Sequence, residues 1–188
     1  MTTEHKVFIG IGLLTLVILV GGVWFLSAQG AKEEKKAATS LMGKEYPTST
    51  QHVPRDEKHE AYNSNPPNSG PHWGDGVAGP GIKNEPVPDE LVIHSMEHGA
   101  AIVWYKQDLP ADQVEKIKTA FNDASGKKIM VPRKNLDTPV ALTSWGRVLT
   151  LETIDEEKIK AFLEPKANNL STLPNSNLSN FETVEKPH

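Results

Sequence analysis

An uncharged apolar stretch near the N-terminus is the strongest constraint on how this chain folds. Residues 7–28 read VFIGIGLLTLVILVGGVWFLSA and contain no charged side chain. As a helix rising about 1.5 Å per residue, the stretch extends roughly 33 Å, enough to cross the hydrocarbon core of a bilayer. A cleaved signal peptide is the alternative, because Ala28 and Gly30 place small residues at the cleavage positions, but signal-peptide apolar cores run only about 7 to 15 residues. The sequence therefore predicts a retained transmembrane anchor behind an N-terminal tail over residues 1–6.

The charges that flank this stretch bear on its orientation. Lys6 precedes it, whereas Lys32, Lys35 and Lys36 follow it. A literal count of positive charges therefore places the rest of the chain in the cytoplasm. Two glutamates interleave with the later lysines, and so short an N-terminal tail is more naturally retained while the large part of the chain is exported. The charges alone leave the orientation open.

The rest of the chain divides by composition into a stalk, a domain and a tail. Residues 29–46 are predicted as a juxtamembrane stalk because they are mostly polar and lack sustained apolar periodicity. A helix over residues 31–42 would continue the anchor. Residues 47–165 have the length of one globular domain. Residues 166–188 are rich in Asn and Ser and are predicted to be a disordered C-terminal tail.

Composition excludes several classes of function. The chain has no cysteine, which rules out disulfides, iron–sulfur clusters, zinc sites built on cysteine and a cysteine nucleophile. Its 20 Lys and Arg are outnumbered by 24 Asp and Glu, so a nucleic-acid partner is not expected. The phosphate-binding loop motif G-x-x-x-x-G-K-[ST] does not occur in the sequence, and no nucleotide cofactor is expected.

A long segment rich in proline and glycine precedes the apolar part of the domain. Residues 65–88 read NPPNSGPHWGDGVAGPGIKNEPVP and hold 11 of the chain's 28 glycines and prolines. Such a segment forms neither a helix nor a central strand. Loops longer than about 15 residues in compact domains are usually functional or disordered. The aromatic content and the prolines favour an ordered loop that forms part of a site.

The segment that follows predicts one α+β domain of interspersed strands and helices. Apolar runs on either side of residues 96–99 favour two strands, or one strand kinked at Gly99. The predicted elements, in order, are strands over residues 91–95 and 100–105, a helix between residues 108 and 125, strands over residues 128–132, 139–144 and 147–152, and a helix ended by Pro165.

Histidines gather in one quarter of the chain. Five of the seven lie between residues 52 and 98, and imidazole is the commonest metal ligand in proteins. In a chain without cysteine this clustering favours a metal site. The five are His52, His59, His72, His94 and His98.

The sequence His94-Ser95-Met96-Glu97-His98 has different meanings in a helix and in a strand. On a helix it is the inverted zincin signature, with two zinc-binding histidines and a glutamate base. The apolar flanks favour a strand, which places His94, Met96 and His98 on one face and Glu97 on the other. Two imidazoles and a thioether suit copper, whereas two imidazoles with His72 and a carboxylate suit zinc. The structural alternative makes Met96 a core residue and gives the histidines no ligand role.

Three ordered motifs identify a family resemblance. Residues 62–73 read YNSNPPNSGPHW, residues 91–99 read LVIHSMEHG, and residues 141–147 read ALTSWGR. Over residues 47–165 the chain resembles domain-of-unknown-function family 3105, found in membrane-anchored bacterial and archaeal proteins. The resemblance implies that the domain is exported behind its anchor. It also implies the signature positions His72, His94, Glu97, His98 and Gly99. The family commonly carries leucine where this chain has Met96, which shifts the expectation from a thioether ligand toward zinc or another imidazole–carboxylate site.

The leading hypothesis is a single-pass membrane protein whose extracytoplasmic domain binds copper or zinc. His72, His94 and His98 are the expected ligands, and Glu97, His52 or His59 complete or orient the site. One alternative is a metal-dependent hydrolase that uses Glu97 as its base. Another is a non-catalytic envelope interaction module that binds an unidentified partner through the proline-rich loop.

Overall fold

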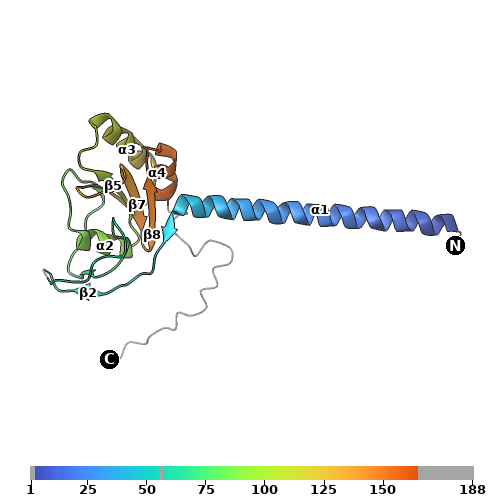
Figure 1. The fold of residues 1–188 in the computed structure, drawn as a ribbon, viewed down its shortest axis with the longest axis horizontal. Coiled ribbons are helices and arrows are strands. Elements are labelled where there is room, and N and C mark those ends of the chain that lie inside the picture. Colours follow the sequence, from blue (N-terminus) through green and yellow to red (C-terminus); the bar gives the residue numbers. More distant parts are fainter. Residues whose placement is uncertain (1–2, 56, 165–188) are drawn as a thin grey trace, which may run out of the picture. The chain divides into compact units, whose positions relative to one another are not determined.

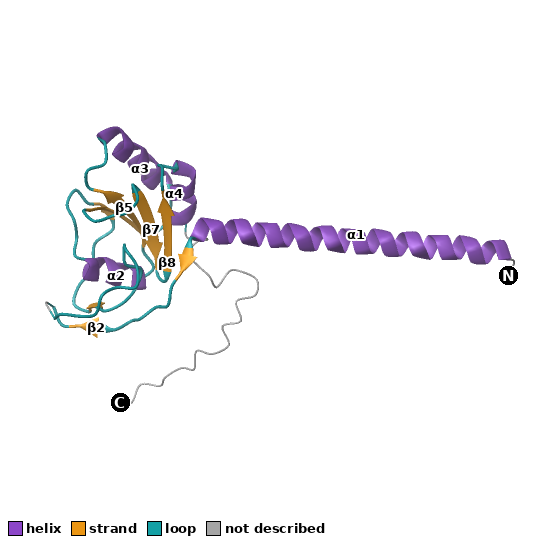
Figure 2. Cartoon of the chain, viewed as in Figure 1, coloured by secondary structure: helices purple, strands orange, loops and turns teal. Residues whose placement is uncertain are grey.

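The computed structural model describes residues 3–55 and 57–164 (Figure 1). The predicted tail over residues 166–188 and the proline that ends the last predicted helix lie outside the described residues. The chain splits into two compact units, Met1–Ser40 and Leu41–His188. Figure 2 distinguishes its helices, strands and loops. The helices are α1 (Thr3–Met42), α2 (Asp89–Glu97), α3 (Ala111–Asp123) and α4 (Glu156–Leu163); the strands are β1 (Lys44–Glu45), β2 (His52–Val53), β3 (His72–Trp73), β4 (Gly81–Ile82), β5 (Ala101–Lys106), β6 (Lys128–Arg133), β7 (Val140–Ser144) and β8 (Arg147–Leu151).

Helix α1 contains the apolar stretch near the N-terminus. Over Thr15–Glu33 it is long and apolar enough to cross a membrane, and none of this window is buried within the described part of the chain. Within this window the large apolar side chains, Trp24 and Phe25 among them, are more than half exposed. The helix continues through residues 29–42, and residues 44–45 form β1. Most of the predicted stalk is thus helical.

Six strands form a mixed sheet in the second unit, in the order β1-β8-β7-β5-β6-β4. Strand β5 lies inside it, parallel to β6 and antiparallel to β7, so that Val103 is paired with Met130 on one side and Leu142 on the other. Helices cover both faces of this strand, which explains why residues 101–105 are an unbroken run of buried apolar side chains. The strands predicted from residue 100 onward are confirmed.

Alternate side chains of β5 contribute to two separate hydrophobic cores. Val103 and Tyr105 pack against α3 and α4, whereas Ile102 and Trp104 pack against α2. The α3–α4 core includes Ile117, Phe121, Ile159 and Phe162. The α2 core includes Val92, Ile93, Met96, Ile129 and Val131. This division leaves the polar face of α2 directed away from the sheet.

The prediction of a strand over residues 91–95 is wrong, because these residues form the middle of α2. Pro88 precedes the helix, and acidic residues occupy its first turn, where they favour the helix dipole. At the other end the Ala100 amide donates to the Ser95 carbonyl over 2.9 Å and the Gly99 amide to the Met96 carbonyl over 2.8 Å. This is a Schellman motif, and Gly99 supplies its left-handed residue with φ of +81°. The glycine therefore ends a helix rather than kinking a strand.

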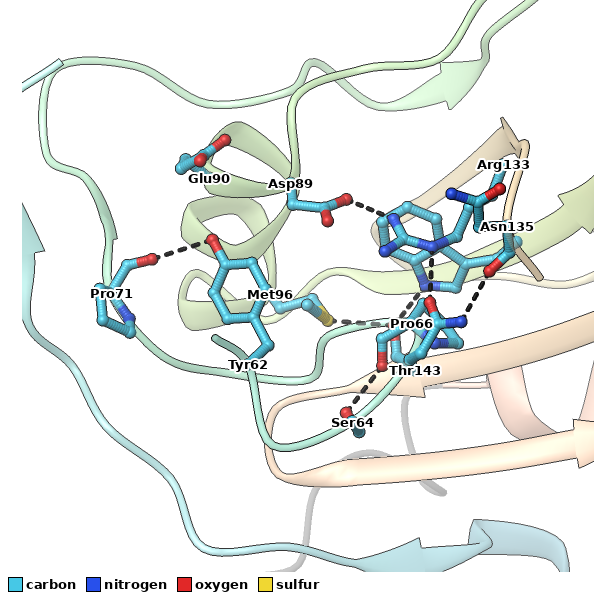
Figure 3. Close-up of polar contacts among 12 residues, drawn as sticks. Tyr62, Ser64, Pro66, Pro71, Asp89, Glu90, Met96, Arg133, Asn135 and Thr143 are labelled. Atoms are coloured by element: carbon cyan, nitrogen blue, oxygen red, sulfur yellow. Dashed lines mark hydrogen bonds and ion pairs between the residues drawn. The ribbon is translucent and has the colours of Figure 1, made fainter. Parts of the chain in front are cut away.

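The proline-rich segment is an ordered loop, as expected, with the short strands β3 and β4 inside it. The side-chain amide of Asn68, which is fully buried, donates to Asn63 Oδ1 over 3.0 Å and to Ser64 Oγ over 2.6 Å. The Tyr62 hydroxyl donates to the Pro71 carbonyl over 3.1 Å (Figure 3). The loop is held against α2 by two further hydrogen bonds, from the Ala78 amide to the Leu91 carbonyl over 3.0 Å and from the Ser95 hydroxyl to the Ala78 carbonyl over 2.8 Å.

Candidate metal centre

Strands β2 and β3 bring two histidines from different parts of the chain together. The strands are parallel, and their register pairs His52 with His72. The His72 amide donates to the Gln51 carbonyl over 3.0 Å, and the centroids of the two imidazole rings lie 4.8 Å apart. Directly paired residues present their side chains on the same face, so the register itself makes this histidine pair.

Helix α2 supplies the other two members of the cluster. His94 and Glu97 are three positions apart and therefore lie on one face of the helix, opposite the face that packs on the sheet. The centroid of the His94 ring lies 5.2 Å from that of His72 and 5.4 Å from that of His52. The apolar positions of α2 thus fix where its two polar side chains point.

Together these elements place four potential ligand atoms within 4.8 Å of one another. Glu97 Oε2 lies 3.1 Å from His72 Nε2, 3.3 Å from His52 Nε2 and 4.0 Å from His94 Nε2. In a tetrahedral zinc site with bonds of about 2.0–2.1 Å, neighbouring ligand atoms are about 3.3 Å apart. The observed separations lie around that value, so the residues fit one tetrahedral ion after small side-chain movements. We call His52, His72, His94 and Glu97 the four-ligand group.

Backbone carbonyl groups orient the two buried histidines. His72 Nδ1 donates to the Gly70 carbonyl over 2.8 Å, and His94 Nδ1 donates to the Gly76 carbonyl over 2.7 Å. A carbonyl oxygen only accepts, so the proton of each neutral ring lies on Nδ1 and the lone pair on Nε2. Metal-binding histidines are typically oriented by such a hydrogen bond from the second ring nitrogen.

The contact between His72 and the Glu97 carboxylate needs a proton or a cation between the two groups. Both ring nitrogens of His72 face oxygen acceptors, namely the Gly70 carbonyl and the Glu97 carboxylate. A neutral imidazole carries only one N–H. The contact with Glu97 therefore requires either a second proton on the ring or a metal cation in its place. A cation there would satisfy the carboxylate and both imidazoles at once.

Contacts with two histidines keep Glu97 in its charged form. Burial by itself raises the pKa of Glu97, but the hydrogen bonds and charges that His72 and His52 supply when their rings are protonated outweigh it and lower the pKa below its ordinary value. The side chain is consequently a carboxylate at neutral pH. That state suits a metal ligand better than a general base, whose pKa is most effective near the working pH.

Exposure is graded across the four-ligand group. The His72 side chain is 0% exposed and that of His94 10%, whereas that of Glu97 is 23% and that of His52 53% exposed. The group is thus closed on the side of His72 and open to solvent on the side of His52.

Two of the predicted ligands lie outside the four-ligand group. His98 follows α2 as its C-cap, and its Nε2 lies 3.1 Å from His94 Nε2. His59 instead hydrogen-bonds through Nε2 to Glu90 Oε1 over 3.2 Å and contacts the Tyr62 hydroxyl over 3.3 Å. Hydrogen bonding to the Glu60 carbonyl, opposed by burial and reinforced by Glu90, raises the pKa of His59.

The structure places Met96 in the core, so the thioether that the extended conformation would offer to copper is absent from the site. Met96 is 1% exposed. Its sulfur accepts a hydrogen bond from the Thr143 hydroxyl over 3.2 Å (Figure 3), and Thr143 Oγ1 in turn accepts from Trp104 Nε1 over 2.7 Å. The helical turn between His94 and His98 points Met96 toward the sheet.

The sequence analysis did not single out the two carbonyl groups that orient the buried histidines. They belong to Gly70 and Gly76, and every residue carries a carbonyl group, so composition offers no signal for them. Gly70 gives a partial signal after the fact: its φ is +127°, and a Cβ there would lie 2.9 Å from the Tyr62 ring. A side chain at this position would disturb the turn that presents the carbonyl to His72.

One of the comparisons with known proteins gave a match. The comparison with curated proteins and that with solved structures gave no match. The scan against protein families gave one that covers well over half of the chain and all four members of the four-ligand group. The chain belongs to the family described as Protein of unknown function (DUF3105), which matches residues 52–180.

Proposed function

We propose that this domain binds one zinc ion through His52, His72, His94 and Glu97. The observation that carries the proposal is the convergence of four ligand atoms within 4.8 Å, supplied by β2, β3 and α2. The fixed Nδ1 hydrogen bonds of the two buried histidines support it, because they leave both Nε2 atoms without a proton and available to an ion.

The chemistry of the donor set favours zinc. Three imidazoles and one carboxylate form a ligand set that zinc accepts in tetrahedral geometry. Copper(I) prefers sulfur ligands, and the described part of the site offers none. Copper(II) accepts imidazole and binds such sites more tightly than zinc does, so competition between the two ions belongs in the test.

The direct test is the metal content of the full chain, purified in detergent without a histidine tag. After chelation and reloading with excess zinc, we expect one equivalent by mass spectrometry of the metal. His72→Ala should lose it, whereas His59→Ala should keep it, because His59 lies outside the four-ligand group. A folded wild-type chain that takes up neither zinc nor copper would refute the proposal.

We also propose that α1 anchors this domain to a membrane and that the domain lies outside the cytoplasm. The apolar window Thr15–Glu33 and the exposure of its side chains support the anchor. The chain should remain in the membrane fraction after a carbonate wash, and protease added outside the cytoplasmic membrane should digest the domain. Release by carbonate, as after removal of a signal peptide, would contradict the anchor, and protection from protease would contradict the orientation.

His94 and His98 are brought together by a helical turn, as the hydrolase alternative requires. The position of Glu97 argues against that alternative. A base must face a metal-bound water from outside the ligand set. Glu97 Oε2 instead contacts both His52 and His72 and carries a lowered pKa. A ligand role for Glu97 predicts that Glu97→Gln weakens zinc binding, whereas a base role predicts that binding is kept. An interaction module without a metal predicts that Glu97→Gln does not change the metal content.

A further inference from the structure

The position of His98 suggests how the ion enters and leaves the site, an inference that rests on the proposed zinc site. His98 Nε2 lies 3.1 Å from His94 Nε2, and the two ring centroids are 4.8 Å apart with the planes inclined by 36°. His94 Nε2 also lies 4.0 Å from Glu97 Oε2. One ring nitrogen is therefore shared between the four-ligand group on one side and His98 on the other.

The separation of the two ring nitrogens suits shared coordination. Two imidazoles bound to one zinc ion place their nitrogen atoms about 3.3 Å apart. His94 keeps its proton on Nδ1, where it donates to the Gly76 carbonyl, so its Nε2 carries a lone pair that is available to His98 or to an ion. Without an ion, His98 donates a hydrogen bond to that lone pair; with an ion between them, both rings are ligands.

Solvent exposure indicates whether an incoming ion meets His98 or the four-ligand group first. His98 is exposed, whereas His72, the innermost ligand, is 0% exposed. An ion arriving from solvent on this side meets His98 before it reaches His72. His52 is also exposed, but its Nε2 contacts Glu97 and belongs to the four-ligand group. Among the histidines that contact the four-ligand group in the described part of the chain, His98 is the one that is exposed and lies outside the final ligand set.

We propose that His98 is an exchange ligand, which binds zinc together with His94 during uptake and release and gives it up to the four-ligand group at rest. The ion passes from His98 and His94 to Glu97, His72 and His52 without leaving His94. During release, His98 returns as an incoming ligand and lowers the barrier to loss of the inner ligands. The site is thereby suited to passing zinc to and from other chelating molecules rather than to holding it permanently.

The test separates the rate of zinc exchange from the affinity for zinc. The full chain in detergent is loaded with one equivalent of zinc and mixed with excess 4-(2-pyridylazo)resorcinol, whose absorbance reports zinc transfer. The dissociation constant is measured separately by competition with a chelator of known affinity. In His98→Gln we expect uptake and release to slow equally, by about tenfold, if the exchange path is about 1.4 kcal/mol easier with His98 present. The dissociation constant should stay unchanged.

Two controls define the result. His59→Gln makes the same substitution outside the site and should change neither rate nor affinity. His98→Ala should reproduce His98→Gln, and thermal unfolding of the metal-free chain reports whether each variant is folded.

The alternative outcomes overturn different claims. Unchanged rates in a chain that binds zinc overturn the exchange role and leave the zinc site standing. Faster release with weaker affinity makes His98 a resident ligand and also overturns the exchange role. Failure of the wild-type chain to bind zinc overturns the proposed function and the exchange role together.

Discussion

His72 Nε2 and Glu97 Oε2 lie 3.1 Å apart, although 25 positions separate them along the chain. A two-residue strand holds one and a nine-residue helix holds the other. No donor is left on neutral His72 to satisfy the carboxylate, because its Nδ1 proton is directed at the Gly70 carbonyl. The pair is the centre of the site and gives the most direct prediction.

Glu97→Gln should weaken zinc binding by about tenfold or more, because it replaces a charged ligand with a neutral amide of the same shape while leaving three imidazoles. Isothermal titration of the full chain with zinc measures the change. Glu90→Gln is the matched control, since Glu90 also lies on α2 but contacts His59. Equal affinity of Glu97→Gln and the wild type would contradict the ligand role.

Zinc binding should weaken as the solution is acidified, because protons compete with the ion for its ligand atoms. The pKa of Glu97 lies below its ordinary value, so the carboxylate stays ionised at mildly acidic pH. The dissociation constant measured between pH 8 and pH 5 checks this. Binding that persists to about pH 4 and then fails would indicate a site made of carboxylates.

The contact between His59 and Glu90 should stabilise the fold at low pH and lose this effect as the pH rises. The pKa of His59 is raised above 6.5, chiefly by its hydrogen bond to the Glu60 carbonyl and despite burial, with Glu90 adding to the effect. A group whose pKa is raised by folding stabilises the folded state fully at pH values below its pKa in the unfolded chain. This stabilisation is lost as the pH rises through its pKa in the folded chain. The wild type should therefore exceed His59→Gln in stability most clearly at pH 5 to 6.

Urea unfolding of both chains with a chelator present measures this difference without interference from metal. A gap in the free energy of unfolding that narrows from pH 6 to pH 9 agrees with the prediction. A gap that widens over the same range would contradict it.

Much of the sheet was predictable because its signals are local. Residues 102–105 are β-branched or aromatic apolar residues in an uninterrupted run, and Trp145-Gly146 marks the turn between β7 and β8. The strand predicted at residues 91–95 failed because a short apolar run has the same appearance in a buried helix and in a strand. The flanks carried the deciding signals: Pro88 and two acidic residues at the start, and Gly99 at the end.

The sequence indicated which residues could form the site but not how they are arranged in space. The density of histidines and the H-x-x-E-H segment indicated His72, His94 and Glu97, and these three lie together in the four-ligand group. It did not separate His52 from His59, because the choice depends on a parallel pairing of only two residues between β2 and β3. Pairing between segments this short leaves no periodic pattern in the sequence.

Two glycines with positive φ provide a final prediction, which separates the backbone strain that a side chain causes from its steric overlap with neighbouring atoms. Gly43 and Gly81 have φ of +71° and +103°, a region that disfavours every residue with a Cβ. A Cβ at Gly81 would meet nothing within 4 Å, whereas a Cβ at Gly43 would overlap the backbone carbonyl of Val148. Gly81→Ala should therefore lower the free energy of unfolding by about 1 kcal/mol, from backbone strain alone.

Gly43→Ala should lower the free energy of unfolding by more, about 3 kcal/mol. The added Cβ would overlap the backbone of β8, which cannot move aside as a flexible side chain can. Urea unfolding followed by tryptophan fluorescence compares the two variants in the same full chain, since Trp104 is buried in the core and reports its loss. Equal losses would mean that β8 shifts to make room, in which case the short pairing of Lys44 with Val148 is adaptable. A larger loss for Gly43→Ala shows instead that the close approach of Gly43 to β8 is part of what fixes this edge of the sheet.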